Sequence, residues 1–251
     1  PEIFKGFLVT CGATYLMCCI GALLFFIIGK AMKMQPKELG LFSGGGVYSN
    51  VIFMGQPLIM AMYGAEGLIF CVAVMFTCNV FLFTVCSVLF AMGSDLKKSA
   101  GQMLKDAFIN LICLSAIIGV FCFVNSISLP QPIFDVLQYS ANTTVCLSMI
   151  YIGSLLAAAN VREIFQDKKV YIFSFLTLIV IPIITKLICG TFMSGMALSV
   201  LVVLMGTPAA AALPSFADLY GNDEKRASEY AFVSTILSVI TLPLVAQFLC
   251  Q

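Results

Sequence analysis

The sequence contains no histidine, and only 10% of its 251 residues are charged. Without histidine the chain has no Ser-His or Cys-His pair, which excludes the commonest forms of nucleophilic catalysis and argues against an enzyme. Soluble domains carry about a quarter charged residues, whereas 61% of this chain is apolar, so the composition excludes a soluble globular protein. The formal net charge of +1 provides no electrostatic basis for binding nucleic acid.

The eleven cysteines form no Cys-x-x-Cys pair and fall within or at the ends of apolar segments. Cysteine in such surroundings usually serves as a small apolar packing residue. A metal site would need a Cys/His cluster with ligand spacing, which the sequence lacks. We therefore expect neither a metal nor any other cofactor.

The chain is organised around residues 50–67, Asn-Val-Ile-Phe-Met-Gly-Gln-Pro-Leu-Ile-Met-Ala-Met-Tyr-Gly-Ala-Glu-Gly. Gly55, Gln56 and Pro57 interrupt this apolar stretch, because proline lacks an amide hydrogen and clashes with the preceding helical turn. Within a bilayer, a broken helix is tolerated only where its freed backbone groups face protein or a wet cavity. Transporters place substrate sites at such breaks, so these three residues and Asn50 are predicted to bind substrate.

Apolar segments of about 20 residues, the length that crosses a bilayer, recur along the chain. Connections between them are too short to hold a soluble domain. The sequence thus predicts an all-α integral membrane protein in the lipid bilayer with eight spans, at roughly 5–29, 40–63, 68–92, 106–124, 135–158, 170–190, 197–220 and 227–250.

Positive charges gather after alternate spans. Eleven of the thirteen basic residues follow the first, third, fifth or seventh span, and these are Lys30, Lys33, Lys37, Lys97, Lys98, Lys105, Arg162, Lys168, Lys169, Lys225 and Arg226. The positive-inside rule predicts that these four loops are cytoplasmic in a multi-pass protein of the plasma membrane. Lys5 and Lys186 lie near the opposite face, where a long side chain can reach the interface.

The broken segment has a counterpart later in the chain. A shift of 157 residues places 56–57 on 213–214 and Asn50 on Thr207, beside Pro208. The same shift superposes spans one to three on spans six to eight, which run in the opposite direction. Inverted repeats of this kind are typical of secondary transporters. A complete five-plus-five repeat would have ten spans, so we expect two helices before Pro1; a natural eight-span variant is the alternative.

The second copy adds further candidates for the substrate site. Thr207, Pro208 and Pro214 bracket a run of alanines that allows another backbone to approach closely, as where two broken helices cross. Asn142 and Thr143 in the fifth span are candidates for the wall of a cavity. For Asn50 the alternative is a hydrogen bond between helices, and for the others it is an ordinary proline kink or a bond to the backbone.

Asp218 is the acid of most interest in the sequence, because it lies within the seventh span, four residues after Pro214. An ionisable residue there is a hypothesis for H⁺ or Na⁺ coupling. Because Asp218 lies close to the end of its span, simple solvation is the alternative.

Several motifs resemble the auxin efflux carrier family, which includes plant auxin carriers and many bacterial permeases. The resemblance rests on Asn-x-x-Phe-Met-Gly-x-Pro-Leu-Ile-x-Ala-Met-Tyr-Gly at 50–64, Leu-Ser-Met-Ile-Tyr-Ile-Gly-Ser-Leu-Leu-Ala at 147–157, Leu-Pro-Ser-Phe-Ala-x-Leu-Tyr-Gly-Asn at 213–222 and Val-Ser-Thr-Ile-Leu-Ser at 233–238. It covers most of the chain.

The resemblance implies two broken, crossing helices at the substrate site, a homodimer, and elevator-type alternating access. It implies transport-domain helices of the first repeat in 1–93, scaffold helices of the second repeat in 106–159, and transport-domain helices of the second repeat in 170–251. It matches the family's asparagine to Asn50 and its crossover prolines to Pro57 and Pro214.

The sequence thus predicts a permease for a small organic anion, such as a dicarboxylate or an auxin-like acid. A channel without coupled transport and a membrane sensor with a transporter fold are the alternatives.

Overall fold

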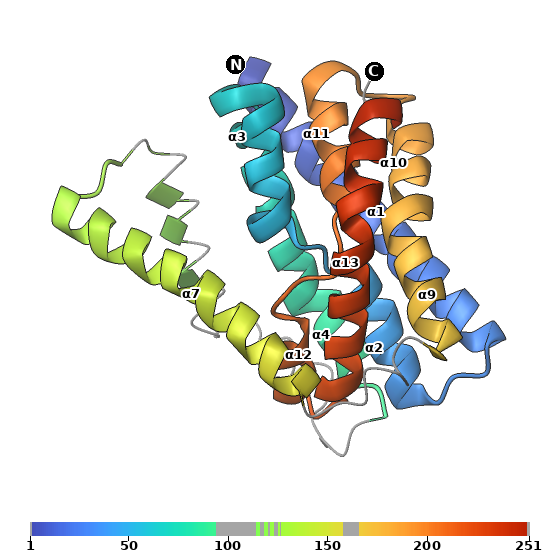
Figure 1. The fold of residues 1–251 in the computed structure, drawn as a ribbon. Coiled ribbons are helices and arrows are strands. Elements are labelled where there is room, and N and C mark those ends of the chain that lie inside the picture. Colours follow the sequence, from blue (N-terminus) through green and yellow to red (C-terminus); the bar gives the residue numbers. More distant parts are fainter. Residues whose placement is uncertain are drawn as a thin grey trace.

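The computed structural model describes residues 2–93, 114–115, 118–119, 121–122, 125, 127–157 and 166–249, and every named element in these ranges is helical (Figure 1). In chain order the elements are α1 (Glu2–Ala31), α2 (Pro36–Val47), η1 (Val51–Gly55), α3 (Gln56–Phe81), η2 (Leu82–Cys86), α4 (Ser87–Phe90), α7 (Gln131–Ala157), α9 (Lys168–Phe175), η3 (Leu176–Val180), α10 (Ile181–Cys189), α11 (Gly195–Met205), α12 (Leu213–Leu219) and α13 (Glu224–Leu249). The elements labelled η are single π-helical turns.

Four helical segments in the described ranges are long and apolar enough to cross a membrane, namely Lys5–Ala31, Val51–Phe90, Lys168–Cys189 and Glu224–Leu249. The helical, apolar architecture supports the prediction of an all-α membrane-embedded protein. The number of spans stays a prediction, because the predicted span 106–124 lies mostly outside the described residues.

The segment Val51–Phe90 reverses direction at Gly64, whose φ of +62° lies in the left-handed region that favours glycine. Residues 59 and 67 would be about 12 Å apart along one continuous helix. Instead, a Cβ placed on Gly67 would lie 2.9 Å from Ile59 Cγ2. The two parts of α3 therefore run antiparallel, and the predicted boundary between spans 40–63 and 68–92 falls at this turn.

The helix ends on one side of the bundle are capped by acidic residues. Asp167 Oδ1 accepts a hydrogen bond of 2.8 Å from Lys169 N at the start of α9. Asp223 Oδ1 accepts one of 2.9 Å from Arg226 N at the start of α13. Such side chains satisfy amide groups that a helix leaves unpaired in its first turn.

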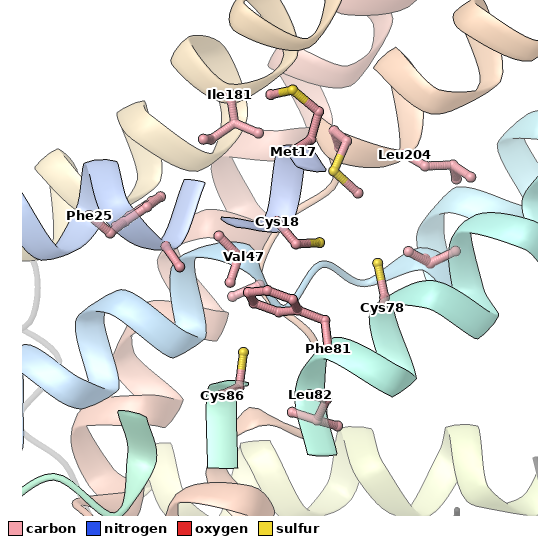
Figure 2. Packing of buried hydrophobic residues seen from close by; sticks show 14 of the residues in the cluster. Met17, Cys18, Phe25, Val47, Cys78, Phe81, Leu82, Cys86, Ile181 and Leu204 are labelled. Carbon is pink, nitrogen blue, oxygen red and sulfur yellow. The ribbon is translucent and has the colours of Figure 1, made fainter. Parts of the chain in front are cut away.

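The core joins helices of residues 2–93 to helices of residues 166–249. Figure 2 shows Met17 and Cys18 of α1, Val47 of α2 and Phe81 of α3 packed in the same cluster as residues of α10 and α11. Four aromatic side chains extend this core from α1, α2, α9 and α13. They are Phe25, Phe42, Phe173 and Tyr230, and Phe173 stacks on Tyr230 with ring centroids 4.3 Å apart.

Helix α7 packs against α13 near its C-terminal end, while its N-terminal part extends away from the bundle (Figure 1). The large apolar side chains of α7 whose surroundings the structure describes are mostly exposed, including Val136, Tyr139 and Ile150. The helix coincides with the predicted span 135–158.

Candidate functional site

Two interruptions of helical structure meet inside the bundle. Helix α2 ends at Val47 and η1 begins at Val51, while α11 ends at Met205 and α12 begins at Leu213. The two connecting segments pair through an antiparallel β-bridge between Ser49 and Ala209. We call residues 48–50 and 208–210 together the crossover.

The crossover satisfies backbone groups that are left without helical partners where α2 and α11 end. Asn50 N donates to Pro208 O, and Ala210 N donates to Tyr48 O, each at 2.8 Å. In an apolar environment an unpaired backbone group is costly, so this reciprocal pair allows both helices to stop inside the bundle.

The three glycines before the crossover allow close packing at the end of α2. A Cβ on Gly46 would lie 2.4 Å from the Phe25 ring, and one on Gly44 would lie 2.6 Å from the Phe90 ring. The corresponding distance from Gly45 to Leu213 Cδ2 would be 3.0 Å. The glycine run therefore permits α1, α4 and α12 to approach α2 where the chain leaves the helix.

Helix α13 supports the crossover through Ser234. Its Oγ accepts a hydrogen bond of 3.2 Å from Ala209 N, and it donates to Tyr230 O at 2.7 Å. Ser234 is fully buried. One hydroxyl thus connects the bridge to the longest helix of the C-terminal part.

Asn50 is 3% exposed and caps the helical segment that starts at Val51. Its Oδ1 accepts a hydrogen bond of 3.3 Å from Phe53 N. Among the described residues no acceptor is found for its Nδ2, so the amide still has donors for a ligand.

A cavity of 240 Å³ opens beside the crossover, and we call it the crossover cavity. It contains two amide side chains, Asn50 and Asn79, and no charged side chain among its described lining. Asn79 Nδ2 donates to Met75 O at 2.9 Å, which leaves its carbonyl oxygen available. The lining comprises Tyr48, Ser49, Asn50, Val51, Ile52, Phe53, Met75, Cys78, Asn79, Ala210, Ala211, Ala212 and Phe216. This arrangement can hold a small, mainly apolar molecule and orient it by hydrogen bonds.

Of the predicted residues around the first break, Asn50 lines the crossover cavity. Gly55 instead packs against α11, since a Cβ there would lie 2.4 Å from Leu204 Cδ2. Gln56 and Pro57 are exposed and do not belong to the cavity lining. The helix also resumes before Pro57, at Val51, so the interruption lies further upstream than the proline suggests.

None of the predicted residues of the second break belongs to the described lining of the crossover cavity. Pro208 supplies the carbonyl that pairs with Asn50. Thr207 is fully buried and donates to Leu204 O at 2.7 Å, and Pro214 is buried in the first turn of α12. Their direct role in substrate binding stays a prediction.

Two other predicted residues lie away from the crossover cavity. Thr143 is exposed on α7 and donates to Tyr139 O at 2.8 Å. Asp218 is exposed near the end of α12 and does not belong to the cavity lining. The side chain of Asn142 lies outside the described part of the structure. The coupling role of Asp218 stays a prediction.

Sequence reasoning did not select several residues that line the cavity. Tyr48 comes from the first connecting segment and Phe216 from α12, and their rings meet edge to face with centroids 5.5 Å apart. Cys78 and Asn79 come from the returning half of α3. Asn79 carries a local signal, because it is an amide in an otherwise apolar run.

A separate set of charged side chains connects the ends of several helices. Arg226 of α13 forms ion pairs with Glu38, Asp167 and Glu229, and Lys169 Nζ lies 2.7 Å from Glu38 Oε2. Burial acts to raise the pKa of Asp167, but hydrogen bonds from Lys169 N and Arg226 outweigh it and lower that pKa. The network therefore favours the ionised carboxylate.

The buried side chain of Asn222 joins the same region to the first part of the chain. Its Nδ2 donates to Phe90 O at 2.6 Å and to Lys37 O at 3.1 Å. From sequence alone, residues 221–226 suggest only a charged turn without phosphate-loop spacing. The turn instead connects α2, α4 and α13.

Comparisons with known proteins agree with this architecture. A model of a family described as membrane transport protein matches residues 2–246. An uncharacterized transporter of Methanocaldococcus jannaschii is 28% identical over 237 residues, which cover 92% of this chain and 75% of that protein.

Proposed function

The chain belongs to the membrane transport protein family, and from this we propose that it is a non-enzymatic permease for a small organic anion. The family match confirms the resemblance to the auxin efflux carriers that was drawn from motifs such as residues 50–64. The observation that carries the proposal is Nδ2 of Asn50, for which no acceptor is found among the described residues, in the lining of the crossover cavity.

The lining of the crossover cavity favours one class of anion. An ionised carboxylate inside a low-dielectric bundle needs hydrogen bonds to replace its water. The amide of Asn50 can supply them, while Val51, Met75 and Phe216 surround the rest of the ligand with apolar surface. A second carboxylate would meet no cation in this lining. The substrate is therefore an acid with one carboxylate and an apolar body in preference to a dicarboxylate.

The packing of the helices is compatible with an elevator-type motion. Residues of 1–93 and 170–251 share one core, which fits a transport domain that moves as a unit. Helix α7, within the proposed scaffold region 106–159, packs mainly against α13. In this proposal two broken, inverted helices carry the crossover, and the substrate crosses the membrane with them.

Membrane orientation and assembly complete the proposal. The basic residues after alternate predicted spans support a cytoplasmic location for those loops, by the positive-inside rule. Coupling to H⁺ or Na⁺ through Asp218 and assembly as a homodimer are further parts of the same proposal.

The test is uptake of radiolabelled acids into proteoliposomes. Indole-3-acetate and malate represent one and two carboxylates. Asn50→Ala removes the amide and the helix cap, whereas Asn50→Asp keeps the capping oxygen and removes the donor. Both variants are expected to remain monodisperse and to lose saturable uptake. Asn125→Ala, which replaces an exposed asparagine, is the matched control.

The alternatives predict different results. A channel would give flux that rises linearly with concentration, and a sensor would bind the acid without flux. Saturable uptake that survives unchanged in both Asn50 variants would remove Asn50 from the substrate site.

A further inference from the structure

A second and larger cavity lies where α1 ends and where α2, α9 and α13 begin. We call it the basic cavity; its volume is 560 Å³ and its lining carries five cationic and three acidic side chains. The lining residues are Lys33, Gln35, Lys37, Glu38, Leu41, Lys169, Asp223, Lys225, Arg226 and Glu229. Since α2, α9, α13 and the loops before α2 and α13 contribute to it, the fold brings together charges that are far apart in sequence.

The three acids of the lining already have partners. Glu38 contacts Lys169 at 2.7 Å and Arg226 at 3.3 Å. Glu229 Oε2 contacts Arg226 at 2.7 Å, and Asp223 accepts from the Arg226 backbone. These carboxylates therefore pair with two of the five cations, Lys169 and Arg226, and cap the start of α13.

The other three cations are Lys33, Lys37 and Lys225. All three are exposed, and within the described residues none of them forms an ion pair. Like charges around one cavity repel each other, and a bound anion would relieve that repulsion. Three positive charges of the lining thus have no described acidic partner, and this favours an anionic ligand.

The backbone of Lys33 is an independent sign of a functional role. Its φ of +54° lies in the left-handed region. Among the described residues other than glycine, Lys33 alone has a positive φ. Lys33 N bonds to Lys30 O, and Met34 N bonds to Gly29 O, so Lys33 occupies the position after α1 where glycine or asparagine is favoured. A strained residue that lines a cavity is a reason to look for function.

We propose that the basic cavity binds a phosphate-bearing anion through Lys33, Lys37 and Lys225. Lysine ammonium groups are good partners for phosphate, whose several oxygens can accept from all three. The start of α2 adds a favourable dipole, since its N-cap residue Gln35 makes no side-chain cap. The cavity is larger than a phosphate group, which leaves room for an organic substituent.

The phosphate group has two possible sources at this place. The cavity lies at the ends of α1, α9 and α13, which belong to membrane-crossing segments, so a lipid headgroup can reach it. A soluble phosphate ester can enter from water. The experiment must therefore separate these two sources.

The experiment measures binding through the thermal unfolding midpoint of the full chain in dodecyl maltoside. One arm adds short-chain phosphatidylglycerol, with the matching diacylglycerol as a control that lacks phosphate. The other arm adds glycerol 3-phosphate. A midpoint rise with phosphatidylglycerol alone identifies a lipid site, whereas a rise with both identifies the phosphate ester itself as the ligand.

Variants test whether the named lysines are responsible. Lys33→Asn keeps a residue that tolerates the left-handed backbone and removes the charge. It is expected to weaken binding at least tenfold while the ligand-free protein stays as stable as the wild type or becomes more stable. Lys30→Asn removes an equal charge from the last turn of α1, outside the lining, and should bind normally.

A second variant, Lys37→Gln with Lys225→Gln, should also lose the midpoint rise. The proposal is overturned if no phosphate compound raises the midpoint of the wild-type protein. It is equally overturned if Lys33→Asn binds as the wild type does, or if Lys30→Asn loses as much binding as Lys33→Asn. None of these results depends on transport activity.

Discussion

The crossover cavity and the basic cavity belong to the same bundle but contain different chemistry. Around the crossover, polar contacts come from backbone groups, the amides of Asn50 and Asn79, and the hydroxyl of Ser234. Around the basic cavity, they come from lysine, arginine and carboxylate side chains. Removing a charge from water costs far more than removing an amide. The buried site therefore uses neutral groups, and charges gather at the helix ends.

This difference has measurable consequences. Neutral hydrogen bonds and close packing respond little to salt or pH, whereas ion pairs near water are screened by salt and titrate with pH. Variants of the two regions should therefore differ in how much stability they lose. They should also differ in how that loss changes with salt and pH.

Gly46→Ala should have the largest effect, because its Cβ would lie 2.4 Å from the Phe25 ring beneath the crossover. We expect a loss of about 3 kcal/mol in the free energy of unfolding, the upper end for overpacked cores. Denaturant unfolding of the detergent-solubilised protein measures it. Gly12→Ala is the control, since nothing lies within 4 Å of a Cβ there, and alanine should stabilise α1 by up to about 1 kcal/mol. Equal stability of both variants would contradict close packing at the crossover.

Ser234→Ala comes next, because it leaves Ala209 N without its acceptor. A buried unsatisfied N–H costs about 2 kcal/mol. Ser228→Ala is matched to it, since Ser228 is also buried on α13 and its Oγ donates to Glu224 O at 2.8 Å within its own helix. If both variants lose the same stability, the bond to the crossover contributes nothing measurable.

The sequence makes the crossover easier to predict than the basic cavity. Glycine, proline and asparagine in an apolar run are local signals, and they place a break near Asn50. They do not give the register of the bridge between Ser49 and Ala209, because the repeat shift of 157 matches equivalent positions of the two copies and says nothing about which of them contact each other. The register depends on packing between helices that are distant in sequence.

The basic cavity depends almost entirely on such distant contacts. Glu38 and Lys169 are 131 positions apart, and Glu38 and Arg226 are 188 apart. Charge patterning places the basic residues on one side of the membrane, but it cannot predict which of them pair. The strained backbone of Lys33 is also invisible in the sequence, because it follows from the way α1 ends.

Arg226→Met tests the charged region. Its side chain is 15% exposed and contacts Glu38, Asp167 and Glu229, so its removal leaves three carboxylates close together. We expect a loss of about 1 kcal/mol at low salt, and a smaller loss in 1 M NaCl because salt screens the remaining repulsion. Ser234→Ala should lose the same amount at both salt concentrations. A salt-independent loss in Arg226→Met would assign its effect to packing on Tyr230 instead.

The smallest effect concerns Asp167, whose pKa is lower than usual in the folded protein. Burial acts to raise this pKa, but hydrogen bonds from Lys169 N and Arg226 lower it by more than burial raises it. An unfolded aspartate takes up a proton near pH 3.9, before the folded one does. The stabilisation by Asp167 is therefore complete above that pH and declines as the pH falls through the folded pKa. The difference in unfolding midpoint between wild type and Asp167→Asn should shrink between pH 6 and pH 3. The difference between wild type and Ser234→Ala should stay constant, because no carboxylate lines the described crossover cavity; a parallel decline in both would remove the distinction between the two regions.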